Sequence, residues 1–292
     1  MKTTTKQKSL LKNIAILVRL NNPAGIFLLL IPALMGIFLN NQILAINHDT
    51  LIKTIILFSI GAIFMRSAGC IINDLLDINF DKNVKRTKNR PLASNAISRY
   101  QALIILAITL VISLIILLQF NFKTIIAGVA IAGLVSIYPL MKRITYFPQI
   151  FLGITFNSPI ILSTIALTNS INLISLILYL ATILWTVIYD SIYAFQDVED
   201  DLRIGTKSTA IKFYKHPKYI LGIIAIIQLT LLLLIAPIAN FSIGYIIINL
   251  MAVIWLIKII KRCDFKDSNQ CLKAFKANQK IGFLMLLAII IG

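Results

Sequence analysis

Nine long apolar runs constrain the fold of this chain more than any other feature of its sequence. They cover residues 20–39, 51–72, 101–120, 124–140, 149–168, 172–192, 219–238, 241–260 and 280–292. About 20 apolar residues are enough for an α-helix to cross a bilayer, and a helix satisfies its backbone hydrogen bonds internally. The sequence therefore predicts an all-α, polytopic membrane protein with about nine transmembrane helices. The last run is short, so we expect it to tilt, to thin the bilayer or to extend into the amphipathic stretch before it.

The composition leaves little room for a soluble domain. Of the 292 residues, 59% are hydrophobic and only 13% are charged, whereas soluble domains carry about 25% charged residues. We therefore interpret residues 1–292 as a single integral-membrane domain that begins with a basic segment, residues 1–19. The formal net charge of +17 would suggest nucleic acid in a soluble chain. In a membrane protein it is typical of loops that fix topology, and no nucleic-acid partner is expected.

The basic residues lie in every second loop. All but three of the 28 Lys and Arg residues precede the first run or follow the second, fourth, sixth and eighth runs. Loops rich in Lys and Arg remain in the cytoplasm. We therefore expect residues 1–19 and these loops on the cytoplasmic side, and the C-terminus on the outside.

Most of the acidic residues fall into two clusters, one at the end of the second run and one at the end of the sixth. They are Asp74, Asp77 and Asp81 in the first, and Asp190, Asp197, Glu199, Asp200 and Asp201 in the second. If each helix continues past the membrane surface, Asn73 and the first cluster share one helix face, and Asp190, Asp197 and Asp201 lie within about 40° of one another. Carboxylates on one face repel each other, and oxygen ligands suit Mg²⁺. We interpret the clusters as a Mg²⁺ site for a diphosphate, with solvated helix ends paired to Lys and Arg as the alternative.

Arg66 is a charged residue inside the second apolar run, where a charge is costly and functional by default. It precedes Asn73 by seven residues, which places it on the same helix face, about 10 Å deeper in the membrane. A guanidinium in that position suits a substrate carboxylate. The structural alternative is an arginine that reaches helix-end carbonyls or the membrane surface.

Two longer motifs resemble those of a known family. Asn73 opens the pattern Asn-Asp-x-x-Asp-x-x-x-Asp, and Asp190 opens Asp-x-x-Tyr-Ala-x-x-Asp-x-x-Asp-Asp-x-x-x-Gly-x-Lys-Ser. Both resemble the aspartate-rich motifs of the UbiA-type intramembrane aromatic prenyltransferases, and the resemblance covers essentially the whole chain. With the lead-in Met-Arg-x-Ala-Gly-Cys at residues 65–70, it is most similar to the members that prenylate 4-hydroxybenzoate in ubiquinone biosynthesis.

The resemblance implies a fold, an activity and a set of site residues. The fold is a helical bundle around a central cavity, capped by cytoplasmic loops that carry the aspartate motifs. The activity is Mg²⁺-dependent transfer of a polyprenyl group from polyprenyl diphosphate to a ring carbon of 4-hydroxybenzoate. It would take place in the lipid bilayer of a bacterial inner membrane, with the active site facing the cytoplasm. The implied catalytic and metal-binding residues are Asp77, Asp81, Asp197 and Asp201. The implied substrate-binding residues are Arg66 at the acceptor, Arg90, Tyr138 and Lys142 at the diphosphate, and Asn73, Asp74 and Asp190.

Two kinds of alternative remain open. Within the family, the acceptor could be homogentisate, dihydroxynaphthoate or haem. From another class, a cation-coupled transporter could use the same acidic residues. Transporters place ionisable residues near the membrane midplane, whereas these acids follow the ends of apolar runs on one side, which favours the enzyme. Cys263 and Cys271 are expected to be free thiols.

Overall fold

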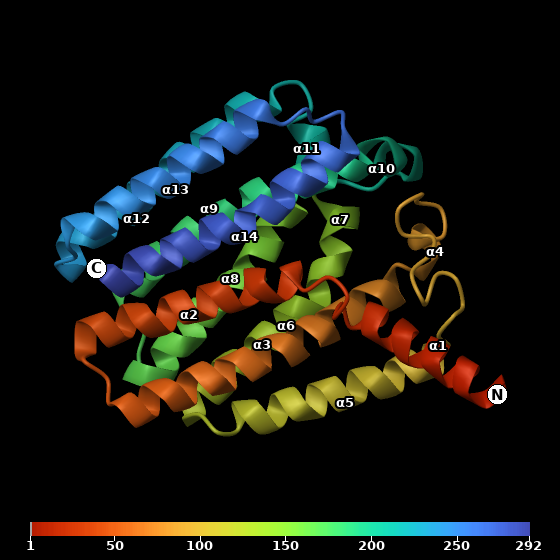
Figure 1. Cartoon of the computed structure of the whole chain (residues 1–292), viewed down its shortest axis with the longest axis horizontal. Coiled ribbons are helices and arrows are strands. Elements are labelled where there is room, and N and C mark those ends of the chain that lie inside the picture. The colour runs from red at the N-terminus through yellow and green to blue at the C-terminus, as the bar shows by residue number, and fades with distance from the viewer. Residues whose placement is uncertain (1) are drawn as a thin grey trace.

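The computed structural model describes residues 2–292 and is built from helices alone over that range (Figure 1). Met1, the first residue of the predicted basic segment, lies outside the described residues, as do the side chains of residues 2–9 and of Ile204. In the described chain, nine helices are long and apolar enough to cross a membrane. They are α2 (Ala24–Leu44), α3 (His48–Leu76), α5 (Arg99–Leu117), α6 (Phe122–Ile137) together with the short helical turns that continue it to Ile144, α8 (Pro148–Thr168), α9 (Leu173–Ala194) together with the turns that continue it to Arg203, α12 (Pro217–Ala239), α13 (Ile243–Arg262) and α14 (Ser268–Ile291). The prediction of nine apolar helices is thus confirmed.

The first and last of these helices have bounds that differ from the apolar runs. The first run was predicted to begin at residue 20, but α2 begins at Ala24, after Pro23 as N-cap. Arg19 has a φ of 63°, a left-handed conformation that turns the chain between α1 (Lys2–Leu17) and α2. At the other end, α14 does extend into the amphipathic stretch, because Asp267 caps it by accepting bonds from the N–H groups of Asn269 and Gln270.

The tightly packed half of the bundle consists of α2, α8, α9, α12, α13 and α14, which share one apolar core. Trp185 of α9 is fully buried there, and its indole N–H donates to Asn278 of α14 at 3.1 Å. Asn157 of α8 donates to Thr186 of α9 at 2.8 Å. Such polar pairs join helices that have no hydrophobic driving force between them in lipid.

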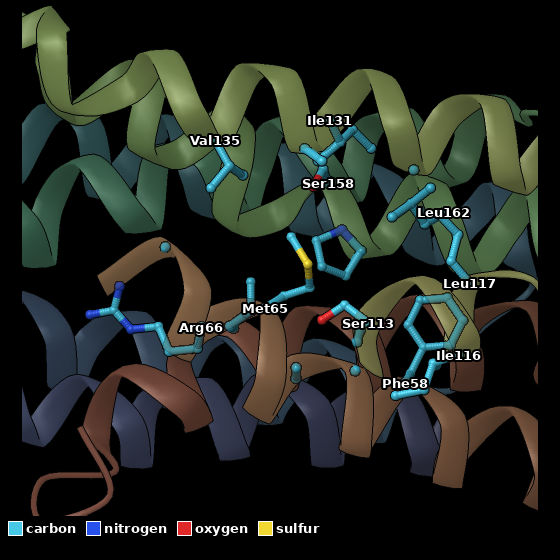
Figure 2. Close-up of a pocket in the computed structure, with 18 of the residues that line it drawn as sticks. Phe58, Met65, Arg66, Ser113, Ile116, Leu117, Ile131, Val135, Ser158 and Leu162 are labelled. Atoms are coloured by element: carbon cyan, nitrogen blue, oxygen red, sulfur yellow. The ribbon is translucent and has the colours of Figure 1, made fainter. Parts of the chain in front are cut away.

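The other half is packed loosely and encloses a cavity. Only 11% of the most apolar 18-residue stretch of α5 is buried, and 17% of that of the span Phe122–Ile144, which contains α6. Most residues of these two helices are therefore at least partly exposed. A cavity of about 370 Å³ lies among α2, α3, α5, α6 and α8 (Figure 2). Its lining is apolar apart from a few hydroxyl groups and Arg66, the one charged residue among those that line it.

The short helices gather at one end of the bundle, where α3 and α9 also end, and the C-terminus lies at the opposite end (Figure 1). They are α4 (Ile78–Asp81), the 3₁₀ turn η1 (Tyr138–Leu140), α7 (Met141–Ile144), the 3₁₀ turn η2 (Phe195–Asp197), α10 (Val198–Ile204) and α11 (Thr209–Lys212). Cys263 and Cys271 are free thiols, as expected; the structure adds that both are buried and that their sulfur atoms lie 4.0 Å apart.

Candidate active site

Both acidic clusters lie where a long helix breaks. α3 ends at Leu76, and Asp77 separates it from α4; α9 ends at Ala194, and η2 separates it from α10. The condition for a shared face, that each helix continues straight past the membrane surface, is therefore not met. Like charges at i and i+4 destabilise a helix, and Asp side chains compete with the backbone for hydrogen bonds. At the breaks, Asp77 pairs with Lys142 and Asp197 pairs with Arg86.

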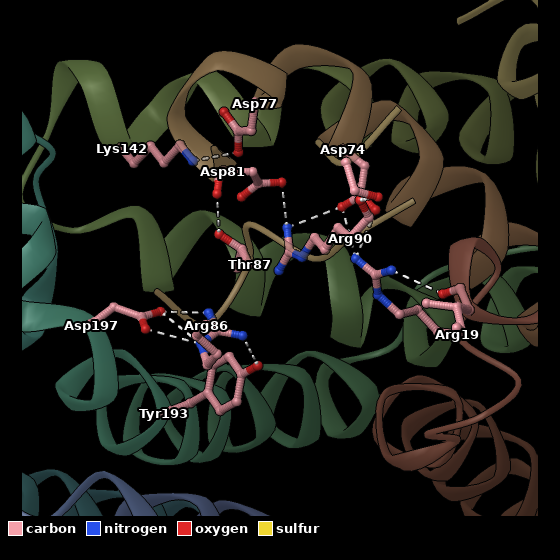
Figure 3. A network of polar contacts seen from close by, with 12 residues as sticks. Arg19, Asp74, Asp77, Asp81, Arg86, Thr87, Arg90, Lys142, Tyr193 and Asp197 are labelled. Atoms are coloured by element: carbon pink, nitrogen blue, oxygen red, sulfur yellow. Dashed lines mark hydrogen bonds and ion pairs between the residues drawn. The ribbon is translucent and has the colours of Figure 1, made fainter. Parts of the chain in front are cut away.

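The first cluster is built around Asp74, which is fully buried (Figure 3). Its carboxylate accepts from Nη2 of Arg19 at 2.7 and 2.9 Å, and from Nη1 of Arg90 at 3.1 Å. The same Nη1 of Arg90 donates to Asp81 at 2.9 Å. Burial raises the pKa of the Asp81 carboxyl above its ordinary value, and the charge of Arg90 opposes that rise. Asp74 is thus occupied in holding two arginines, and Arg90 links it to Asp81.

Asp77 faces away from that network, toward α7. Its Oδ2 accepts a hydrogen bond from Lys142, and its Oδ1 lies 3.6 Å from Nη2 of Arg143. Oδ1 is buried and has no hydrogen-bond partner in the described chain. Tyr138, half-buried in η1, precedes Lys142 by one helical turn. The first cluster is therefore divided between two directions rather than stacked on one face.

The second cluster is joined to the first by the loop of residues 82–98 (Figure 3). From that loop, Nε of Arg86 donates to both oxygens of Asp197, at 2.9 and 3.1 Å. Nη1 of Arg86 donates to the hydroxyl of Tyr193 at 2.8 Å. Asp201, half-buried, accepts from the hydroxyl of Thr206 at 2.8 Å. Two acidic segments more than a hundred residues apart thus meet across one basic loop.

Asn73 and Asp190 differ from the other predicted residues because their side chains make no hydrogen bond or ion pair with the described residues. Both are half-buried. The structure therefore brings Asp74 and Asp81 together with Arg90, and Asp77 together with Lys142. It pairs Asp197 with Arg86 and Asp201 with Thr206, and it leaves Asn73 and Asp190 without such partners.

The donor set can be tested against Mg²⁺. Within residues 2–292, no three acidic, histidine or cysteine side chains converge as a metal cage made of protein alone. Mg²⁺ does not require one, because it commonly binds one or two carboxylates together with substrate phosphates and water. The buried, unsatisfied Oδ1 of Asp77 and the carboxylates now neutralised by Lys142 and Arg86 are hard oxygen donors of this kind. The residues fit an ion that binds together with a phosphate group.

Arg66 lies at one end of the cavity, away from Phe58 and Ile116 (Figure 2), and on α3 it precedes Asp74 of the first acidic cluster by eight residues. Its guanidinium stacks over the ring of Phe156, with Cζ 5.0 Å from the ring centroid. Nε is buried without a hydrogen-bond partner among the described residues. Neither a carboxylate nor a helix-end carbonyl of the described chain accepts from it. The guanidinium therefore keeps unused donors beside the cavity.

Sequence reasoning missed Arg19 as part of the site. It belongs to the basic segment, residues 1–19, and its charge was interpreted as a topology signal only. The available signal was its position: it comes four residues before Pro23, at the edge of the first apolar run, rather than in the open N-terminus. Tyr193 and Thr206 were also missed as partners of the second cluster, because only the folded chain brings Tyr193 to Arg86.

The fold and the site define the class of protein. It is an integral membrane protein with a site of basic and acidic residues at one end of its helices and an apolar cavity beneath that site. Such an arrangement can bind a molecule that has a charged head group and an apolar tail. The chain belongs to the UbiA prenyltransferase family, which it matches over residues 29–287. It is 39% identical to the 4-hydroxybenzoate octaprenyltransferase of Blochmanniella pennsylvanica (strain BPEN), over 95% of this chain and 94% of that protein. It is 38% identical to the mitochondrial 4-hydroxybenzoate polyprenyltransferase of Drosophila melanogaster, over 96% of this chain and 71% of that protein.

A solved structure shares the fold. The UbiA homolog from Archaeoglobus fulgidus, bound to GPP and Mg²⁺, superposes with a TM-score of 0.67 over 95% of this chain and 99% of that one, at 17% sequence identity. The helical bundle predicted from the sequence is confirmed by this likeness.

Proposed function

We propose that this chain is a Mg²⁺-dependent 4-hydroxybenzoate polyprenyltransferase of ubiquinone biosynthesis. The observation that carries the proposal is one continuous arrangement: carboxylates and cations at the end of the bundle, Arg66 with unused donors below them, and an apolar cavity beyond. The bacterial and mitochondrial relatives named for 4-hydroxybenzoate support the acceptor. The archaeal homolog bound to GPP and Mg²⁺ supports the donor and the metal.

We assign roles to the site residues from their surroundings. Asp77, Asp81, Asp197 and Asp201 would hold Mg²⁺. The diphosphate would be bound by Arg90, Tyr138 and Lys142, with Asp74 fixing Arg90. Asn73 and Asp190, which lack polar partners in the described chain, remain available to the substrates. Arg66 would bind the carboxylate of the acceptor.

These roles account for the reaction. Mg²⁺, when bound, supplies positive charge that favours departure of diphosphate. Arg90 and Lys142 add fixed charges where the negative charge of the leaving group grows. The apolar cavity keeps water away from the allylic carbon as its bond to oxygen breaks. Arg66 holds the acceptor so that the ring carbon beside the phenol faces that carbon; a carbon–carbon bond forms and a ring proton leaves.

The test is a set of parallel incubations. Membranes containing the chain receive polyprenyl diphosphate, Mg²⁺ and one acceptor: 4-hydroxybenzoate, homogentisate, dihydroxynaphthoate or haem. We expect mass spectrometry to find the prenylated product with 4-hydroxybenzoate, and none after chelation of Mg²⁺. A product with another acceptor alone would contradict the acceptor assignment. No product with any acceptor, together with cation flux in liposomes, would favour the transporter.

The chain is an integral membrane protein, and we propose that it forms one domain in a bacterial inner membrane with its acidic site in the cytoplasm. The basic loops at that end of the bundle support this orientation. The α8–α9 loop, which includes the exposed Asn169, is free of charged residues, and in this orientation it would face outward.

Cysteine labelling tests the orientation. In a variant whose three native cysteines are alanine, a cysteine at Asn169 is expected to react in intact cells with a membrane-impermeant maleimide. A cysteine at the exposed Lys88 should react only after lysis. The reverse pattern would place the acidic site outside.

A further inference from the structure

The guanidinium of Arg66 contacts residues of two neighbouring helices. The ring of Phe156, from α8, lies with its centroid 5.0 Å from Cζ. Gly25, in the first turn of α2, lies against the guanidinium as well. A Cβ at Gly25 would be 2.6 Å from Nε, 2.8 Å from Nη2 and 3.0 Å from Cζ of Arg66, closer than non-bonded carbon atoms pack. Only glycine leaves space for Arg66 at this position.

The space left by the missing side chain of Gly25 is occupied by the side chain of Arg66. The three atoms nearest to a Cβ at Gly25 all belong to that one side chain. Gly36, further along α2, differs because a Cβ there would meet the backbone of Ile160 and the hydroxyl of Ser163, so it serves helix packing. Nor does the backbone require glycine at residue 25, because Gly205 is the one glycine with positive φ in the described chain.

The contacts fix the plane of the guanidinium. With Phe156 and Gly25 against it, the group has little freedom to tilt, and its buried Nε remains without an acceptor in the described chain. A planar fork held in one orientation binds a carboxylate through two parallel hydrogen bonds. Fixing the donors in advance also lowers the entropy that binding loses.

We propose that Gly25 is a positioning residue for the acceptor: by lacking a side chain, it lets Arg66 take the orientation that binds the acceptor carboxylate. This inference rests on the proposed function, in which Arg66 meets that carboxylate. Because the neighbouring atoms belong to a long, flexible side chain, a methyl group at residue 25 moves Arg66 rather than either helix.

The experiment measures both Michaelis constants in Gly25→Ala. We expect the KM for 4-hydroxybenzoate to rise about ten- to hundredfold, because a displaced guanidinium loses its charge-assisted hydrogen bonds to the acceptor carboxylate, which contribute about 1.5–3 kcal/mol. The KM for polyprenyl diphosphate should stay within about twofold, because Arg90 and Lys142 are untouched by this local displacement. The matched control is Gly133→Ala in α6, where a Cβ meets nothing within 4 Å; both constants should remain unchanged.

A double substitution separates positioning from packing. In the Arg66→Ala background, Gly25→Ala should add no further loss, because the group it displaces is gone. If the rise in KM of the double variant instead equals the product of the rises in the two single variants, Gly25 does not act through Arg66 and the inference is overturned. Phe156→Leu removes the other contact of the guanidinium without adding bulk, so it should raise the KM for 4-hydroxybenzoate even if Gly25→Ala folds poorly.

The outcomes distinguish this inference from the proposed function. If the wild-type chain fails to prenylate 4-hydroxybenzoate, the proposed function fails. If the wild type is active but Gly25→Ala and Phe156→Leu both leave the acceptor KM unchanged, the positioning role of Gly25 fails alone.

Discussion

Asp197→Asn is expected to reduce prenyl transfer by at least about a hundredfold, because losing even an outer-shell partner of a metal costs about ten- to hundredfold. Asparagine has the same shape but lacks the charge that we assign to Mg²⁺. The same result is expected for Asp77→Asn, whose buried Oδ1 has no hydrogen-bond partner in the described chain. The measurement is turnover in membranes over a range of Mg²⁺ concentrations, with folded yield determined in parallel.

Two control variants make this result specific. Asp49→Asn changes an exposed aspartate in the first turn of α3, far from the site, and should leave turnover unchanged. Arg86→Gln removes the ion pair with Asp197 but keeps the carboxylate, so a smaller loss is expected. Equal losses in Arg86→Gln and Asp197→Asn would mean that Asp197 serves to hold the loop. Near-normal turnover in either aspartate variant would refute the two-cluster metal site.

Arg66→Ala should raise the KM for 4-hydroxybenzoate about ten- to hundredfold, since a hydrogen bond to a charged group contributes about 1.5–3 kcal/mol. The KM for polyprenyl diphosphate should change little, because that substrate is assigned to Arg90 and Lys142. Arg66→Lys should restore only part of the affinity, because a point charge cannot replace the planar fork. Steady-state kinetics with each substrate varied in turn provides the measurement.

A neutral acceptor supplies the control for Arg66. An ester or amide of 4-hydroxybenzoate should be a poor acceptor for the wild type and should lose little more in Arg66→Ala. If the variant instead bound 4-hydroxybenzoate normally and polyprenyl diphosphate poorly, Arg66 would belong to the diphosphate site.

The helices could be predicted from the sequence because each depends on a local property. A long apolar run has to cross the membrane as a helix, and nine such runs gave nine such helices in the described chain. The alternation of basic loops placed both acidic segments at one end of the bundle, where the structure has them. The start of α2 was misplaced by four residues, because the apolar Leu20 was counted with the run although the polar Asn21 and Asn22 interrupt it and Pro23 sets the helix boundary.

The polar networks could not be predicted, because they depend on contacts between distant segments. Helical periodicity placed Asn73 to Asp81 on one face, but the break at Asp77 turns that carboxylate to Lys142 and leaves Asp74 with Arg19. The contact between Gly25 and Arg66 joins two helices, and a glycine in an apolar run carries no sign of its neighbour. Local pattern identifies candidate residues, and tertiary packing decides which atoms meet.

Because α5 and α6 are weakly packed, the cavity that they help to line is sensitive to the lipid or detergent that surrounds the protein. Leu114 and Leu117 of α5 line the cavity, while Val111 and Ile115 of the same helix are exposed. One wall of the cavity is thus a single helix thick, with acyl chains on its outer side. Lateral pressure in the bilayer acts directly on such a wall. Detergent micelles, thin bilayers and sterol-rich bilayers differ in the pressure they exert, so we expect the width of the cavity offered to an isoprenoid chain to differ between the solubilised protein and the protein in its native membrane.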